Sequence, residues 1–200
     1  MTQTVFIVDD DDAVRGALGQ MLEISGFNVK AYADGSTFVS DCDEHVSGCV
    51  LLDMAMPVLD GHGVQAQLNA RGIRIPVIFL SGHGEVPDAV QAVQAGAMDF
   101  LQKPATSASL LASVRKALAL DLENREADSR TKRIHAGYAM LSPREKEVMA
   151  LVTDGLANKE IARKLKISPR TVEVHRNHVM YKMGAESLAH LVKMSAVCHS

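Results

Sequence analysis

Three short stretches in the first half of the chain are apolar at every position: Val5–Val8, Val50–Leu52 and Val77–Leu80. Successive strand residues point to opposite faces, so such strands need apolar cover on both faces of their sheet. We therefore expect a doubly wound α/β domain, with a five-stranded parallel sheet between helices. Strands are predicted over 4–9, 28–32, 49–53, 76–81 and 99–102, and helices over 13–25, 36–44, 62–70, 86–95 and 107–122.

The chain divides by charge into an acidic first part and a basic second part. Residues 1–120 hold 7 Lys and Arg against 14 Asp and Glu, whereas residues 121–200 hold 14 against 10. The basic part suggests a polyanionic partner, although a solvated surface explains so modest an excess equally well. Residues 118–133 are densely charged, and Gly137 is expected to interrupt a helix there. We predict a first domain over 1–122, a partly helical linker over 123–139 and an all-helical domain over 140–200.

Composition excludes several classes of protein. An apolar fraction of 47% is enough for a buried core, which excludes a disordered or collagen-like chain. Three cysteines without C-x-x-C spacing favour free thiols in a reducing compartment over a disulfide framework or a zinc finger. No apolar run approaches a membrane span in length, and the first residues lack the pattern of a secretion signal. We expect a cytoplasmic protein with no membrane partner.

Reactive side chains stand where four predicted strands end. Asp9 and Asp10 lie at the first strand end, Asp53 at the third, Ser81 at the fourth and Lys103 after the fifth. The carboxyl ends of parallel strands meet at one edge of the sheet, where the ligand crevice lies. Gathered carboxylates repel one another unless a cation lies among them, and oxygen ligands suit Mg²⁺. Any one acidic residue could merely cap the next helix, but the set at four strand ends points to a magnesium-assisted phosphoryl acceptor.

Four sequence blocks resemble the receiver domains of response regulators over roughly residues 3–120: FIVDDDDAVR, LLDMAMPVLDG, FLSGHGEVPDAV and AGAMDFLQKP. The resemblance implies a flavodoxin-like fold in which Asp53 accepts a phosphoryl group. It implies a magnesium site in which Asp10 binds directly and Asp9 through water, completed by Asp53 and the backbone carbonyl of Ala55. The switch and phosphate-pairing residues that it implies are Ser81, Phe100 and Lys103. It also implies a cis peptide bond between Lys103 and Pro104.

Phosphorylation would add a charge of about −1.5 to −2 to this acidic site. Ser81, drawn toward the phosphoryl group, would vacate space for Phe100 to rotate and so change the face of the fourth helix and fifth strand. We predict that this face mediates dimerisation through one apolar stripe; the alternative is that the stripe belongs to the core. The stripe consists of Val86, Ala89, Val90 and Val93.

Two positions depart from the common receiver pattern. Ala55 offers no polar side chain to orient an attacking water, so dephosphorylation would depend on His83 or on a partner. Ala105 stands where close relatives often carry phenylalanine, which could alter coupling at that edge.

The basic part carries the pattern of a helix-turn-helix. Ser142 is a strong helix start, a short helix begins near Asn158, and a longer one runs from Ser168-Pro169 to Met183. On a projection of the longer helix one stripe is apolar and should be buried: Val172, Val179 and Met183. The opposite stripe carries residue types that read base edges: Arg170, Val174, Asn177 and Tyr181, with Glu173 beside them. Cations that could ring this stripe with phosphate contacts are Lys159, Arg163, Lys164, Lys166, Arg176 and Lys182, although a solvated surface explains any one of them.

Residues 140–195 resemble the LuxR-type DNA-binding domain nearly end to end, through LSPREKEVMALVTDGLANKEIARKLKISPRTVEVHRNHVMYKM. The resemblance implies a second dimer contact through the final helix, over 187–197. The two domains together are similar to FixJ/NarL-type response regulators. The residues implied to approach bases are Glu173, Val174 and Asn177. Those implied to hold the DNA backbone are Lys159, Arg170, Arg176 and Lys182.

These features predict a two-component transcription factor rather than an enzyme. A histidine kinase would phosphorylate Asp53, and the dimer would bind an inverted repeat in promoter DNA and recruit RNA polymerase. One alternative is a Mg²⁺-dependent phosphohydrolase, which Ala55 disfavours because it leaves no general acid there. Another is a DNA-binding protein whose receiver only dimerises or senses a ligand, which the intact acidic set disfavours.

Overall fold

The computed structural model describes residues 3–82, 90 and 92–198 of the 200-residue chain. It forms two compact units, Met1–Arg125 and Glu126–Ser200, and the division falls inside the segment predicted as linker. Within the described residues, no helix has both the length and the apolar character that crossing a membrane requires.

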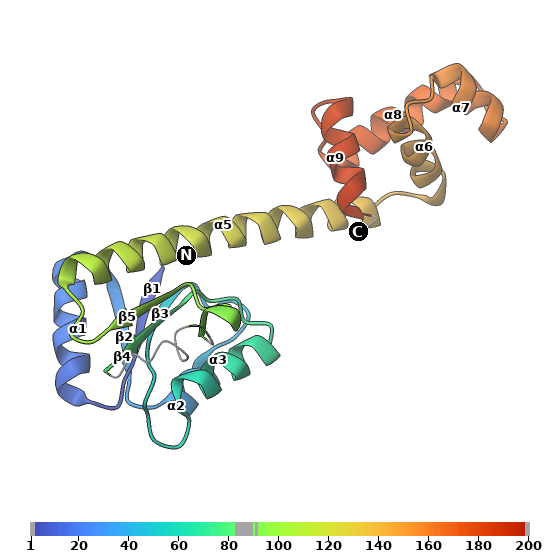
Figure 1. The fold of residues 1–200 in the computed structure, drawn as a ribbon. Coiled ribbons are helices and arrows are strands. Elements are labelled where there is room, and N and C mark those ends of the chain that lie inside the picture. Colours follow the sequence, from blue (N-terminus) through green and yellow to red (C-terminus); the bar gives the residue numbers. More distant parts are fainter. Residues whose placement is uncertain (1–2, 83–89, 91, 199–200) are drawn as a thin grey trace. The chain divides into compact units, whose positions relative to one another are not determined.

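The first unit is built on one sheet with the order β2-β1-β3-β4-β5, in which every neighbouring pair is parallel (Figure 1). The predicted doubly wound α/β fold is confirmed, and each strand lies within one residue of its predicted range. The strands are β1 (Thr4–Val8), β2 (Asn28–Tyr32), β3 (Gly48–Asp53), β4 (Val77–Ser81) and β5 (Asp99–Gln102).

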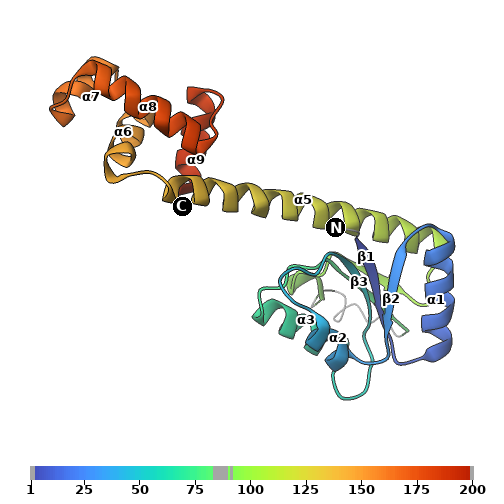
Figure 2. The same ribbon diagram turned by 180° about the vertical axis from the view of Figure 1, so that it is seen from behind.

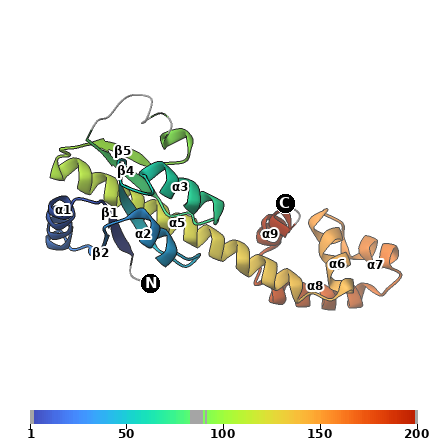
Figure 3. The ribbon, with the colours of Figure 1, turned by 90° about the horizontal axis from the view of Figure 1, so that it is seen from below.

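Alternate residues of the central strands enter two cores, one on each face of the sheet. Figures 2 and 3 show α1 (Asp12–Ile24) on one side of the sheet, and α2 (Gly35–Asp41) and α3 (Gly61–Ala70) on the other. Leu52 of β3 packs with the buried residues of α2 and α3, whereas its neighbour Leu51 packs with those of α1 and of α5 (Ser107–Ala139). This two-sided burial explains the uninterrupted apolar runs.

The helix α5 (Ser107–Ala139) is longer than the sequence predicted. Its 33 residues include the whole of 123–139, and Gly137 lies within it rather than interrupting it. A Cβ at Gly137 would lie 2.9 Å from the carbonyl oxygen of Lys182, so glycine permits a close approach to α8 (Pro169–Met183). This contact offsets the roughly 1 kcal/mol that glycine costs inside a helix. The helix predicted over 86–95 lies partly outside the described residues. Within this segment, residues 90 and 92–94 are helical.

The second unit contains four helices besides the end of α5 in the described residues (Figure 1). The predicted start at Ser142 is confirmed: its hydroxyl accepts from the backbone N–H of Glu145, whose carboxylate accepts from the N–H of Ser142. Lys166, at φ 53°, makes the tight turn between α7 (Asn158–Leu165) and α8. These helices are α6 (Pro143–Thr153), α7 (Asn158–Leu165), α8 and α9 (Leu188–Cys198).

Candidate functional site

The carboxyl edge of the sheet in the first unit brings two carboxylates and one ammonium group together. Asp53 ends β3, Asp9 directly follows β1, and Lys103 directly follows β5. The Lys103 Nζ donates to Asp53 Oδ1 at 2.5 Å and to Asp9 Oδ2 at 2.7 Å. Asp53 and Asp9 lie 50 and 94 positions from Lys103 in the sequence, yet both contact its ammonium group. The predicted fold required such a meeting of distant segments.

Backbone groups fix the orientation of both carboxylates. Asp53 Oδ2 accepts from the N–H of Ala55 at 2.9 Å, and Asp9 Oδ1 accepts from the N–H of Asp11 at 2.9 Å. The guanidinium of Arg15 donates to the carbonyl oxygen of Asp9 at 2.6 Å. Both carboxylates are buried, so their oxygens are paired with the N–H groups of Ala55 and Asp11 and with Lys103 rather than with bulk water.

The ammonium of Lys103 responds to two opposing influences. Burial disfavours its charged form, but hydrogen bonds to Asp53 and Asp9 outweigh burial and raise the pKa of Lys103 above its usual value. The lysine is therefore charged at neutral pH. It compensates one of the two neighbouring negative charges and leaves the site an excess of negative charge.

Gly61 supports the backbone at Asp53 and Met54, a role that the sequence analysis missed. Its N–H donates to the carbonyl oxygen of Met54 at 3.1 Å. A Cβ there would lie 2.6 Å from the carbonyl oxygen of Asp53 and 2.9 Å from the ring of Phe79. The only signal in the sequence was a glycine just after Asp60, which caps α3.

The second candidate site is the exposed face of α8 in the second unit. As the projection predicted, Val172, Val179 and Met183 are buried in the core of that unit. Residues on the other side of the helix are exposed: Arg170, Glu173, Val174, Asn177 and Tyr181. Five exposed cations lie on α7, in the turn and at the start of α8: Lys159, Arg163, Lys164, Lys166 and Arg170. A helix pair with such a face fits the major groove of DNA.

Comparison with known proteins decides the family. Residues 5–115 match the response regulator receiver domain, and residues 139–195 match the luxR family of bacterial regulatory proteins. The chain belongs to the response regulators. It joins a receiver domain to a LuxR-type DNA-binding domain, the architecture of phosphorylation-dependent transcriptional regulators.

This response regulator is similar to other response regulators along nearly its whole length. It is 44% identical over 190 residues to the tetrathionate response regulatory protein TtrR of Salmonella typhimurium, covering 95% of this chain and 90% of that one. It is 44% identical over 192 residues to the transcriptional regulatory protein FixJ of Azorhizobium caulinodans, covering 96% and 90%. The structure of the response regulator StyR superposes with a TM-score of 0.90 at 39% identity, covering 98% and 99%. Full-length FixJ from B. japonicum gives 0.60 at 38% identity, covering 100% and 98%.

The receiver domain places the other predicted site residues at different depths. Ser81 is buried at the end of β4, and its carbonyl oxygen accepts from the N–H of Lys103 at 2.7 Å. Phe100 is half-buried against the core, and the predicted cis peptide bond between Lys103 and Pro104 is confirmed. Val90 and Val93 are exposed, whereas Val86, Ala89 and His83 lie outside the described residues.

The predicted magnesium ligands are only partly gathered. Asp10 and Ala55 are exposed, and among the described residues no three His, Cys, Asp or Glu side chains converge closely enough to hold a metal ion. Asp9 and Asp53, however, already place oxygens around one cation, the ammonium of Lys103. Mg²⁺ in proteins takes one or two carboxylates and keeps several waters. The donor chemistry of Asp9 and Asp53 therefore fits this ion.

Two cations predicted to hold the DNA backbone are bound within the domain. The Lys182 Nζ donates to Glu145 Oε2 at 2.7 Å, and Arg176 donates to Asn158 Oδ1 at 2.6 Å. Lys182 pairs with a buried carboxylate that also accepts from Ser142, so it supports the folded domain. A helical projection could not show these pairs because their partners lie on other helices.

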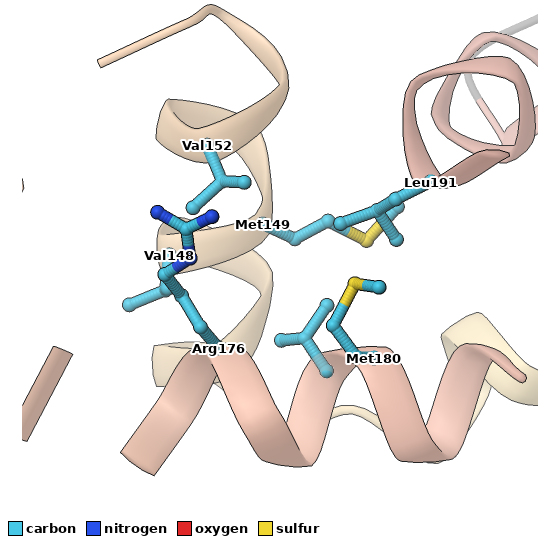
Figure 4. A pocket seen from close by; sticks show the side chains of 7 residues that line it. Val148, Met149, Val152, Arg176, Met180 and Leu191 are labelled. Carbon is cyan, nitrogen blue, oxygen red and sulfur yellow. The ribbon is translucent and has the colours of Figure 1, made fainter. Parts of the chain in front are cut away.

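Figure 4 shows a gap between α6, α8 and α9, with Met149, Met180 and Leu191 around it and Arg176 at its side. Its volume is about 10 Å³ and its lining is apolar, which is at most the space of one water molecule. It is a packing gap rather than a ligand site.

The loop after Asp53 contains a strained residue. Val58 has φ 69°, and the N–H of Leu59 donates to the carbonyl oxygen of Pro57 at 2.8 Å, which makes a tight turn around it. This region is unfavourable for a β-branched residue, and the fully exposed Val58 side chain gains no packing in return.

Relieving this strain is expected to stabilise the receiver domain. Asparagine tolerates the left-handed region, so Val58→Asn should raise the free energy of unfolding by about 1 kcal/mol. Val58→Thr, which remains β-branched, is the matched control and should change it little. Urea denaturation followed by circular dichroism measures both; equal stability of the two variants would refute the strain.

Proposed function

We propose that Asp53 accepts a phosphoryl group from a partner histidine kinase, and that the phosphorylated protein dimerises and binds promoter DNA to recruit RNA polymerase. The observation that carries this proposal is the buried Asp53 carboxylate, held by Lys103 on one oxygen and by the N–H of Ala55 on the other. A buried carboxylate held in one orientation at the carboxyl edge of the sheet is a suitable nucleophile.

The residues around Asp53 have separate roles in the transfer. Asp53 attacks phosphorus, so that a bond from its oxygen to phosphorus forms as the bond to the kinase histidine breaks. Lys103 pairs with a phosphoryl oxygen, and the Ser81 hydroxyl donates to another. Asp9, Asp10, Asp53 and the carbonyl of Ala55 would hold Mg²⁺, which supplies positive charge against that of the phosphoryl group.

The switch follows from the added charge. Ser81, buried at the end of β4, moves toward the new oxygens, and Phe100 on neighbouring β5 fills the vacated space. This rearrangement would alter the surface that carries Val90 and Val93, two exposed apolar side chains that suit a dimer contact. In the DNA-binding domain, α9 supplies the second dimer contact.

In the DNA complex, α8 occupies the major groove. Glu173, Val174 and Asn177 approach base edges, while the exposed Lys159 and Arg170 approach phosphates. Two recognition helices in a dimer would then read half-sites about one turn of DNA apart.

Labelling with acetyl phosphate and Mg²⁺ tests the assignment of Asp53. Intact mass spectrometry should show one phosphoryl group on the wild type and none on Asp53→Asn. Asp41→Asn, which changes an exposed aspartate at the end of α2, is the matched control and should label like the wild type. Equal labelling of the wild type and Asp53→Asn would remove the nucleophile assignment.

A further inference from the structure

Tyr181 is the most exposed of the large hydrophobic side chains in the described part of the DNA-binding domain. Its relative exposure is 86%, although tyrosine is a residue of intermediate burial in folded proteins. It lies in the last turn of α8, on the exposed stripe that includes Arg170, Val174 and Asn177. An aromatic ring left in water on the face that meets a ligand indicates a contact with that ligand.

The spacing along α8 gives the part of the DNA that Tyr181 can reach. Arg170, Val174, Asn177 and Tyr181 follow one another at intervals of three or four residues, so they form one continuous stripe. At about 1.5 Å per residue, Tyr181 lies roughly 10 Å along the helix axis from Val174. The major groove is about 12 Å wide, so a helix that reads bases near its start brings its last turn to the phosphates at the groove wall.

The cation next to Tyr181 in the sequence is paired within the domain. Lys182, the next residue, has its ammonium 2.7 Å from the buried carboxylate of Glu145, and only 29% of its side chain is exposed. His178, one turn earlier, lies 3.4 Å from the same carboxylate. The last turn of α8 therefore offers DNA the hydroxyl of Tyr181, whereas the exposed Lys166 and Arg170 lie at the start of this helix.

We propose that Tyr181 is a DNA-backbone contact, whose phenolic O–H donates to a phosphate oxygen while its ring covers the adjacent sugar. This inference rests on the proposed function, because it requires α8 to occupy the major groove. The charge of the domain as a whole suits a polyanion, since Lys159, Arg163 and Arg170 are exposed on it. A phosphate contact carries no sequence information, so Tyr181 contributes affinity rather than base preference.

The test uses the full-length protein treated with acetyl phosphate and Mg²⁺. Two labelled duplexes serve as probes: a site selected from a random pool by the wild type, and an unrelated duplex of the same length. Fluorescence anisotropy should show that Tyr181→Phe weakens binding to both duplexes by the same factor, about threefold to tenfold. The salt dependence should stay unchanged, because a neutral donor releases no counterion. Thermal unfolding should match that of the wild type, since the hydroxyl is exposed.

Glu173→Ala provides the contrasting control, because it should change the preference between duplexes. Unchanged affinity of Tyr181→Phe for both duplexes would overturn the proposal, as would a loss confined to the selected site. If the wild type itself does not distinguish the selected site from the unrelated duplex, the proposed function fails rather than the role of Tyr181.

Discussion

Lys103→Met is expected to destabilise the receiver domain by about 3 kcal/mol, because it leaves two buried carboxylates without their shared cation. The ammonium lies 2.5 Å from Asp53 and 2.7 Å from Asp9, and both carboxylates are almost inaccessible to water. Methionine keeps much of the length of the side chain and removes the charge. Amide hydrogen exchange of the β1 and β3 peptides, read by mass spectrometry, measures the loss within the domain.

Mg²⁺ and a control variant make this prediction specific. Added Mg²⁺ should restore more stability to Lys103→Met than to the wild type, because the freed oxygens of Asp9 and Asp53 suit that ion. Lys30→Met removes a lysine from an exposed pair with Asp41 and should cost no more than about 1 kcal/mol. Equal stability of Lys103→Met and Lys30→Met would show that Lys103 does not compensate the acidic site.

The pKa of Lys103 gives the expected dependence on pH. Because this pKa is raised in the folded state, the contribution of Lys103 is fully present below its unfolded value of 10.5. Above that value the contribution should decline, and it should be lost as the pH rises through the folded pKa. Between neutral pH and the unfolded value of 10.5, the stability difference between wild type and Lys103→Met should therefore stay constant.

Glu145→Ala is expected to destabilise the DNA-binding domain by about 3 kcal/mol. Glu145 is only 3% exposed, and its carboxylate accepts hydrogen bonds from Lys182 and from the N–H of Ser142. Alanine removes one half of the capping box and leaves a partly buried ammonium unpaired. Amide hydrogen exchange of α6 and α8 should report this opening, and sequence-specific DNA binding should weaken with it.

The same carboxylate predicts a loss of stability in acid. Hydrogen bonds from Lys182 and from the Ser142 backbone lower the pKa of Glu145 from 4.5 to about 2. Its contribution is present above the unfolded value of 4.5 and is lost as the pH falls toward 2. Glu147→Ala, on the exposed side of α6 and paired with Arg144, is the matched control and should cost no more than about 1 kcal/mol. If the difference in unfolding free energy between wild type and Glu145→Ala were the same at pH 5 and at about pH 2, this account would be contradicted.

Much of the fold could be read from local sequence signals. Strands β1, β3 and β4 are apolar at nearly every position because both of their faces are covered. Such uninterrupted apolar runs can be recognised in the sequence alone. Ser142 and Ser168 mark the starts of α6 and α8 because capping chemistry is local. The positions of the strand ends also predicted that Asp9 and Lys103 meet Asp53, whereas the predicted partner Asp10 is exposed.

What the sequence could not show depends on contacts between distant segments. Gly137 has the character of a helix breaker, yet α5 continues through it because it packs against Lys182. Lys182 itself resembled a phosphate-binding cation because a projection places its side chain but not its partner Glu145. The strained backbone of Val58 was also hidden, because a valine gives no local signal for a positive φ.

DNA binding with and without phosphorylation tests the central claim most directly. The probe is a duplex selected from a random pool by the acetyl phosphate-treated protein, and the measurement is its dissociation constant for treated and untreated protein. Treatment should tighten binding by the wild type at least about fivefold and leave Asp53→Asn unchanged. The same dissociation constant for treated and untreated wild type, despite labelling of Asp53, would contradict the coupling of the acidic site to the DNA-binding domain.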